Sequence, residues 1–247
     1  MKSFVASLLL AASLFGPQAS AGEFTPESYR AVFQGDSQFR QKQAIEALAM
    51  AGLSDPAIFD ALEARLIASL PEATDKTAVD YSAWLVKGLA YSGNDKYLGT
   101  IDSLIHGSYP KKLRKYAKQA RANLSQYKVW NAILTDKSHY DIGQSQSNNL
   151  YANALHSNEL ELMRMAAKRL MEESKYDDFM LSQLSSELQA QRLLSNDKLA
   201  IDTYAHMAKA LASSGNVKYR PVIADIAANA PQKKLRNYAA KYMKSYY

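Results

Sequence analysis

The chain has 247 residues, of which 47% are hydrophobic and 22% are charged, and its net charge is +6. This length and composition are sufficient for one large or two small hydrophobic cores. The sequence contains no cysteine, which excludes disulfide bonds, thiolate metal sites and a cysteine nucleophile. The positive surplus is compatible with an anionic partner, but it is too small to indicate a protein that binds nucleic acid.

The N-terminus has the layout of a secretory signal peptide. Lys2 precedes an apolar run over residues 4–15, Pro17 breaks this run, and residues 19–21 (Ala-Ser-Ala) offer a small-residue cleavage site. The run is too short to span a bilayer comfortably, and no later segment is apolar enough for a transmembrane helix. We therefore expect cleavage after Ala21 and export to a bacterial periplasm or to the outside of the cell. A retained N-terminal anchor is the alternative.

The remainder of the chain shows helical periodicity. One apolar helix face is formed by residues at helical spacing: Leu113, Tyr116, Ala117, Ala120 and Leu124. Asp55 and Pro56 supply an N-cap and a first-turn proline, and Gly93 and Gly215 follow apolar helices where a left-handed residue ends the helix. Twelve helices are predicted, near 25–34, 37–51, 55–69, 75–92, 95–107, 110–125, 147–157, 159–174, 177–191, 197–214, 217–229 and 232–246.

The second half of the chain repeats the first at an offset of 122 residues. Residues 92–117 and 214–239 align without a gap and are identical at twelve of 26 positions. Similarity of this extent predicts an internal duplication with three helical hairpins in each copy.

The predicted organisation has four parts. They are a signal peptide, a first repeat half, a connecting segment and a second repeat half: 1–21, 22–125, 126–149 and 150–247. The connecting segment is expected to begin with a short helix and to end in a polar loop or hinge. We favour one continuous stack with this segment packed against its middle, and two hinged lobes are the alternative. The oligomeric state is left open.

The second helix of several hairpins carries a recognisable motif. Residues 113–117 (Leu-Arg-Lys-Tyr-Ala) and 235–239 (Leu-Arg-Asn-Tyr-Ala) follow an apolar-Arg-x-x-Ala pattern, and residues 163–167 also fit it. This pattern resembles the short HEAT-like repeats first named for phycobilisome lyases. The first hairpin departs from it, with Lys42 where arginine is expected and Ile45 in place of alanine. The resemblance implies an all-α fold, an α-α superhelix (HEAT-like solenoid) of about six hairpins, and it does not transfer an activity.

One position of the second helices alternates in sign with the same spacing in both halves. Its residues are Lys42, Asp80 and Arg114, followed by Arg164, Asp202 and Arg236. Because equivalent positions of stacked repeats face each other, each aspartate is expected to lie between two cations. We interpret the six residues as a structural ladder that sets the register between repeats, rather than as a catalytic site.

Two groups of lysines and tyrosines surround this ladder. They are Lys111, Lys112, Lys115 and Lys118 in the first half, and Lys233, Lys234, Tyr238, Lys241 and Tyr242 in the second half. A functional interpretation makes them patches that bind an anionic polymer or an acidic protein surface. We favour the alternative, in which the lysines are solvated and the tyrosines close the end of the core.

No catalytic motif accompanies this pattern. The four histidines are scattered, His206 occupies the position of Trp84 in the first copy, and no phosphate loop or serine nucleophile elbow occurs. We therefore predict no enzyme activity, no metal and no cofactor. The leading hypothesis is an exported interaction or scaffold protein that binds an unidentified protein partner through its helical-repeat surface. The alternatives are a binder of anionic envelope polymers through the Lys/Tyr patches and a protein with lyase-like or chaperone-like activity.

Overall fold

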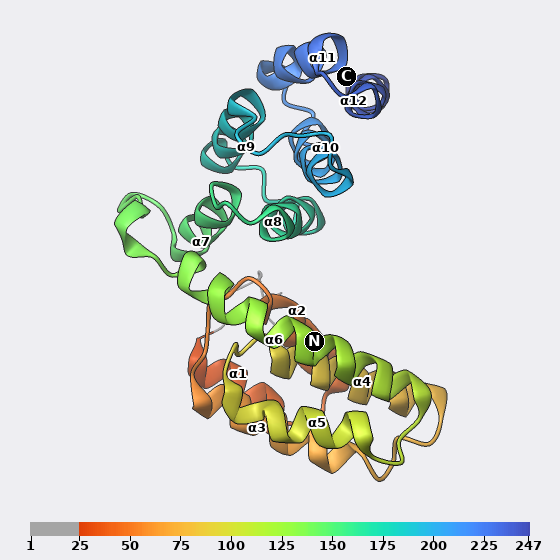
Figure 1. Ribbon diagram of the computed structural model, residues 1–247. Coiled ribbons are helices and arrows are strands. Elements are labelled where there is room, and N and C mark those ends of the chain that lie inside the picture. Colours follow the sequence, from red (N-terminus) through yellow and green to blue (C-terminus); the bar gives the residue numbers. More distant parts are fainter. Residues whose placement is uncertain (1–24) are drawn as a thin grey trace, which may run out of the picture.

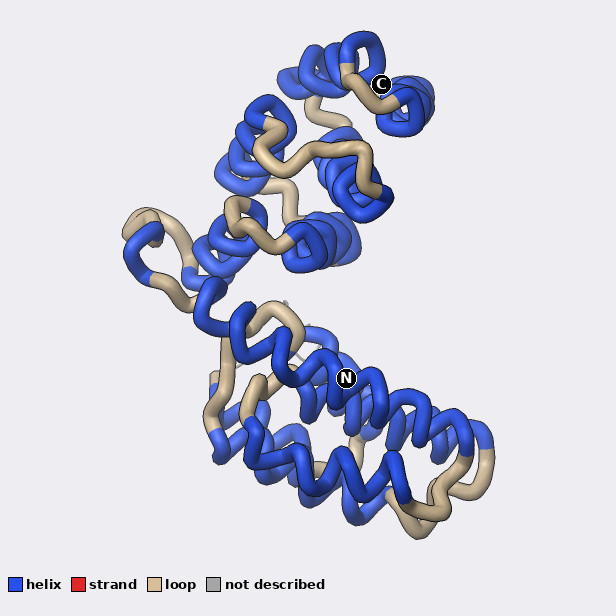
Figure 2. The backbone as a smooth tube through the Cα atoms, in the orientation of Figure 1, coloured by secondary structure: helices blue, strands red, loops and turns tan. Residues whose placement is uncertain are grey.

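The computed structural model describes residues 25–247, so the predicted signal peptide at 1–21 lies outside the described residues. Within residues 25–247 the chain forms twelve α-helices and three short 3-10 helices, without any strand (Figure 2). The α-helices are α1 (Pro26–Gln34), α2 (Gln38–Leu48), α3 (Pro56–Ser69), α4 (Lys76–Ala90), α5 (Leu98–His106), α6 (Lys111–Leu134), α7 (Gln146–Leu155), α8 (Leu160–Glu172), α9 (Asp178–Ala190), α10 (Lys198–Ser213), α11 (Arg220–Asn229) and α12 (Lys233–Tyr246).

Seven of the twelve α-helices in the described part of the chain begin at a side chain that accepts a hydrogen bond from a free backbone N–H group. Asp75 caps α4 by accepting bonds from the N–H groups of Thr77 and Ala78, at 2.7 and 2.9 Å. Asp55 caps α3 in the same way, and Pro56 supplies its first residue, where a backbone N–H is not needed. Local sequence therefore accounts for the starts of these helices.

Consecutive helices pack as hairpins, and the hairpins stack into two rows (Figure 1). In the row of second helices, α4 packs between α2 and α6, and α10 packs between α8 and α12. The first helices, among them α1 with α3 and α7 with α9, form the other row. The predicted all-α, HEAT-like architecture of stacked helical hairpins is thereby confirmed.

The longest helix, α6, differs from the prediction. It was expected over 110–125, but it continues to Leu134, so the first part of the predicted connecting segment belongs to α6. The continuation is stabilised by Tyr127, Trp130 and Leu134, which extend the buried face of α6 at helical spacing. A short 3-10 helix (Lys137–His139) and a polar loop then lead into α7.

The core is continuous across the two halves. One cluster of buried apolar residues runs from Tyr29 in α1 to Tyr242 in α12. Buried amides reinforce the junction: the Nδ2 of Asn153 donates to the carbonyls of Ile133 and Leu134 at 3.1 Å, which satisfies the C-terminus of α6. The end of α6 is therefore packed into the middle of the stack (Figure 1).

In the part of the chain that the structure describes, no helix is both long enough and apolar enough to cross a membrane.

A candidate binding groove at the junction of the halves

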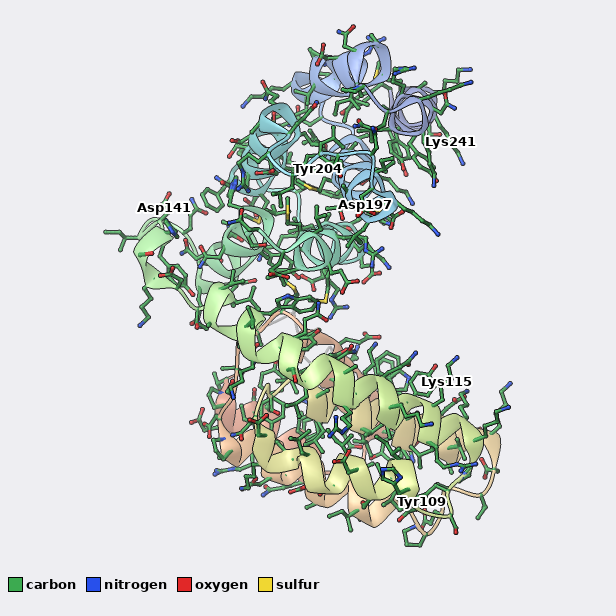
Figure 3. The ribbon with its side chains drawn as sticks, viewed as in Figure 1. Tyr109, Lys115, Asp141, Asp197, Tyr204 and Lys241 are labelled. Carbon is green, nitrogen blue, oxygen red and sulfur yellow. The ribbon has the colours of Figure 1, made fainter. Side chains whose placement is uncertain are left out.

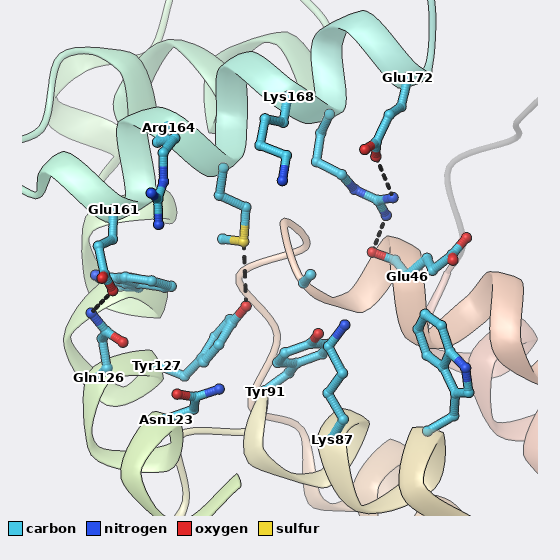
Figure 4. Close-up of a pocket in the computed structure, with 15 residues that line it drawn as sticks. Glu46, Lys87, Tyr91, Asn123, Gln126, Tyr127, Glu161, Arg164, Lys168 and Glu172 are labelled. Atoms are coloured by element: carbon cyan, nitrogen blue, oxygen red, sulfur yellow. Dashed lines mark hydrogen bonds and ion pairs between the residues drawn. The ribbon is translucent and has the colours of Figure 1, made fainter. Parts of the chain in front are cut away.

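The row of second helices carries a groove where the two halves meet. Its cavity has a volume of about 430 Å³ and is lined by side chains from α2, α4, α6 and α8 (Figure 4). Helices α2, α4 and α6 belong to the first half and α8 to the second, so the groove exists only where the halves are packed together.

The floor of the groove is aromatic. The rings of Tyr91 and Tyr127 are 4.6 Å apart, and Trp130 meets Tyr127 edge-on at 5.0 Å. All three are nearly fully buried, which raises the pKa of Tyr91 and of Tyr127 and keeps both hydroxyls protonated. The Tyr127 hydroxyl donates to the Sδ of Met165 at 3.5 Å, so this floor also contacts α8. Stacked aromatic rings of this kind offer a rigid, amphipathic contact area.

Both tryptophans of the chain line the groove. Trp130 belongs to the floor, and Trp84 on α4 is half-buried at the edge. The indole Nε1–H of Trp130 is buried and has no hydrogen-bond partner among the described residues. Tryptophan emission therefore reports on this groove alone.

A half-buried amine stands beside the aromatic floor. The Nζ of Lys87 lies 4.6 Å from the centre of the Trp84 ring. Burial lowers the pKa of Lys87; the carboxylate of Glu46 opposes this, and the charges of Arg169 and Lys168 add to it. A perturbed amine in a groove marks a candidate functional position.

Helix α8 forms the opposite wall and is tied to the first half by polar contacts. The Arg169 guanidinium donates to the backbone carbonyl of Glu46 at the end of α2, and it also pairs with Glu172 at 3.4 Å. Nearer the start of α8, the Nε2 of Gln126 donates to the carboxylate of Glu161 at 3.0 Å. These contacts set the width of the groove.

The predicted ladder is formed in part. Arg164 pairs with Asp202 at 2.8 Å, as expected. Asp80 pairs with Lys112, whereas Arg114 is exposed and makes no side-chain hydrogen bond or ion pair with a described residue. The prediction for Arg114 was therefore wrong, because Lys112, two residues earlier, is the cation that reaches Asp80.

The ends of the ladder also deviate. Lys42 forms no ion pair with a described residue, although its charge contributes to the lowered pKa of Asp80, for which the hydrogen bond from Lys112 is the main cause. Arg236 does not pair with Asp202 but donates to the carbonyls of Ala230 and Pro231, at 2.6 and 3.1 Å. Its guanidinium closes the loop between α11 and α12, which is a structural role of a different kind.

The Lys/Tyr patches lie apart from the groove and from each other. Lys111, Lys115 and Lys118 are exposed on α6, while Lys233, Lys234 and Lys241 are exposed on α12. Helices α8 and α10 lie between these two helices in the stack, and Figure 3 shows Lys115 and Lys241 pointing outward from different halves.

On α12 the tyrosines stack along the helix. Tyr238 and Tyr242 are 6.3 Å apart with nearly parallel rings, and Lys234 lies 5.7 Å from the ring of Tyr238. Tyr242 is buried and Tyr238 is half-buried, as expected of residues that cover the end of the core.

The sequence motifs do not point to the groove residues, which are Lys87, Tyr91, Tyr127, Trp130 and Lys168. Trp84 was noted only as the counterpart of His206. The available signal was the apolar period of residues 113–124, which continues through Tyr127, Trp130 and Leu134. In the described part of the chain, no group of three or more His, Asp or Glu residues is placed to hold a metal ion.

No known protein family matches the chain, and no curated protein matches it either. Among solved structures, the chain is similar to human deoxyhypusine hydroxylase in complex with glycerol, with a TM-score of 0.37 and 12% sequence identity. The similarity covers 90% of this chain and 84% of that chain. A likeness of this degree assigns no activity to the chain.

Proposed function

We propose that this chain is an exported, non-enzymatic interaction protein that binds an extended segment of a protein partner in the junction groove. The observation that carries the proposal is a groove with an aromatic floor and a polar rim on the row of second helices. Helical-repeat proteins act mostly by binding along such a surface.

The size and lining of the groove support a peptide ligand. About 430 Å³ falls within the range of roughly 300–1,000 Å³ that is typical of ligand pockets. Tyrosine and tryptophan side chains are the residues that most often dominate binding energy at interfaces. Asn123 and Gln126 on α6 add amide groups that are suited to a peptide backbone.

A second candidate function is the binding of an anionic envelope polymer. It is favoured by the exposed lysines of α6 and α12, of which only Lys112, with Asp80, and Lys128, with Asp95, form ion pairs with described residues. The two functions differ in salt dependence, because screening weakens contacts made by several exposed lysines far more than contacts in an aromatic groove.

The test is affinity capture from envelope extract, followed by a titration of the captured partner against the purified protein. Trp84→Ala removes an aromatic wall of the groove, and His206→Ala is the matched control at the equivalent position of the second half. We expect Trp84→Ala to weaken binding by about tenfold or more, as at an interface hot spot. Binding should also change the tryptophan emission of the native protein.

Two results would contradict this proposal. The first is a partner that binds Trp84→Ala and His206→Ala equally well. The second is captured material that salt releases from the protein and that no longer binds when four lysines are replaced by glutamine: Lys111, Lys115, Lys233 and Lys241. That result would support polymer binding instead.

A further inference from the structure

Two amines face each other across the junction groove. Figure 4 shows Lys168 directed into the groove from α8 and Lys87 directed into it from α4. Neither amine forms an ion pair with a described residue, and their mutual repulsion contributes to the lowered pKa of Lys87. The other two cations of the lining are already neutralised, Arg164 by Asp202 and Arg169 by Glu172. The middle of the groove therefore holds two amines that lack an ion-pair partner among the described residues, and the Glu46 carboxylate offsets only part of the effect of burial on Lys87.

Negative charge lies on both sides of this pair. Along α8, Glu161 precedes Lys168 by seven residues, which corresponds to about 10 Å at a rise of about 1.5 Å per residue. On the other side Glu46 of α2 is exposed, and its carboxylate forms no ion pair with a described residue. The unpaired charges thus alternate along the groove as negative, positive and negative.

We propose that the groove selects a peptide segment with three features. It has an acidic residue, an aromatic or large apolar residue directly beside it, and a basic residue about three positions away on either side. This inference rests on the proposed function and specifies its ligand. The acidic side chain is placed between Lys87 and Lys168, and its apolar neighbour lies on the floor of Tyr91, Tyr127 and Trp130. A basic side chain then reaches Glu161, because an extended chain covers about 10 Å in three residues.

The charge pattern argues against a uniform polyanion in this groove. A polymer with a negative charge on every unit would place charges against Glu161 and Glu46 as well as between the two lysines, and like charges in an interface are strongly unfavourable. A segment with alternating charges satisfies all of these positions. Electrostatic complementarity of this kind provides specificity more than affinity.

The experiment is selection of random displayed peptides on the immobilised full protein, followed by competition titrations with the enriched peptides. Three variants are compared with the native protein: Lys87→Gln, Lys168→Gln and, as the matched control, Lys209→Gln at the position equivalent to Lys87 in the second half. Circular dichroism melts establish that each variant is folded.

We expect enriched peptides to share the acidic, aromatic and basic pattern. Their affinity should fall by about tenfold in Lys87→Gln and in Lys168→Gln, and remain unchanged in Lys209→Gln. Replacing the acidic residue of the peptide with glutamine should produce the same loss on the native protein and no further loss on Lys87→Gln.

Other outcomes separate this inference from the function on which it rests. Enriched peptides that lack an acidic residue, or that bind both lysine variants at full affinity, would overturn the charge assignment. If those peptides still lose binding in Trp84→Ala, the groove remains a peptide site. If no enriched peptide depends on Trp84, both the charge assignment and the proposed function fail.

Discussion

Among the described residues, Glu187 is the only charged side chain that is fully buried. Its carboxylate accepts a hydrogen bond from Tyr204 at 2.8 Å, and Arg192 pairs with it at 2.8 Å. His156, at the end of α7, places its Nδ1 3.5 Å from the same carboxylate and its Nε2 2.6 Å from the side-chain oxygen of Gln183. Both ring nitrogens thus face acceptors, which favours the protonated imidazolium.

These contacts shift the pKa of both His156 and Glu187. The hydrogen bond with Glu187 raises the pKa of His156, against the opposing effect of burial and of the Arg192 charge. Burial alone would raise the pKa of Glu187, but the hydrogen bonds from His156, Tyr204 and Arg192 outweigh it and hold this pKa below its usual range. A buried carboxylate of this kind requires all of its partners.

We predict that His156→Gln destabilises the protein more in acid than in base. The folded-state pKa is raised, so the stabilising contribution of His156 is complete below its ordinary pKa of about 6.5 and is lost as the pH rises through the folded-state pKa. Urea unfolding at about pH 5.5 and at about pH 9 measures the difference, and His139→Gln, at an exposed histidine, is the control. An equal effect of His156→Gln at both pH values would contradict the prediction.

At the scale of the element, the backbone of α6 limits which residues fit in the turn after α4. Gly93 and Gly215 occupy equivalent turns after α4 and α10, with φ of +60° and +66°. A Cβ added at Gly93 would lie 2.6 Å from the backbone nitrogen of Lys128 in the continued part of α6. At Gly215 a Cβ would meet no atom within 4 Å. Identical local sequences thus lie in different surroundings.

We predict that Gly93→Ala is much more damaging than Gly215→Ala. The control Gly215→Ala loses only the freedom of glycine in a left-handed conformation, about 1 kcal/mol, whereas Gly93→Ala adds overpacking against a helix backbone, for a total of about 3 kcal/mol. Urea denaturation monitored by circular dichroism gives both free energies of unfolding. Equal losses in the two variants would show that α6 does not press on this turn.

Helix α6 also shows where a helix boundary can be misjudged. The sequence predicts an end near residue 125, whereas the helix ends at Leu134. The apolar period nevertheless continues through Tyr127, Trp130 and Leu134, and burial at the junction stabilises the additional turns.

At the scale of the whole molecule, a few side chains tie the halves together. Arg169 on α8 binds the C-terminal backbone of α2, and its side chain is only 17% exposed. The Nδ2 of Asn131 on α6 donates to the carbonyl of Tyr91 at 2.9 Å and to the hydroxyl of Ser54 at 3.1 Å. The bond of Arg169 joins the two halves, and the bonds of Asn131 hold the end of α6 on the loops of the first half.

We predict that Arg169→Ala loosens the contact between the halves. A hydrogen bond from a charged group to a helix terminus contributes about 1.5–3 kcal/mol, and this guanidinium also holds Glu172. The free energy of unfolding should fall by about that amount, and small-angle scattering should show a broader distribution of overall dimensions. Lys168→Ala, at the exposed neighbouring residue, should change stability by less than about 0.5 kcal/mol. Matching behaviour of the two variants would mean that Arg169 is not a tie.

The sequence by itself determined the twelve helices, their grouping into hairpins and the stacked all-α architecture. The reason is physical: apolar spacing, capping residues such as Asp75 and the duplication act over short distances along the chain. The sequence also predicted the ion pair of Arg164 with Asp202 correctly, because these residues repeat at a fixed period. It did not determine which cation reaches Asp80, since that depends on side-chain reach within the folded stack.

Only the tertiary structure decided the candidate site. Trp84, Lys87, Tyr127 and Lys168 lie on three helices and are brought together where the repeat is interrupted, between the last helix of one half and the first hairpin of the next. The periodic pattern predicts which helical hairpins stack on each other within each half. The junction follows instead from the continuation of α6 and from the packing of α8 across it, which no local pattern encodes.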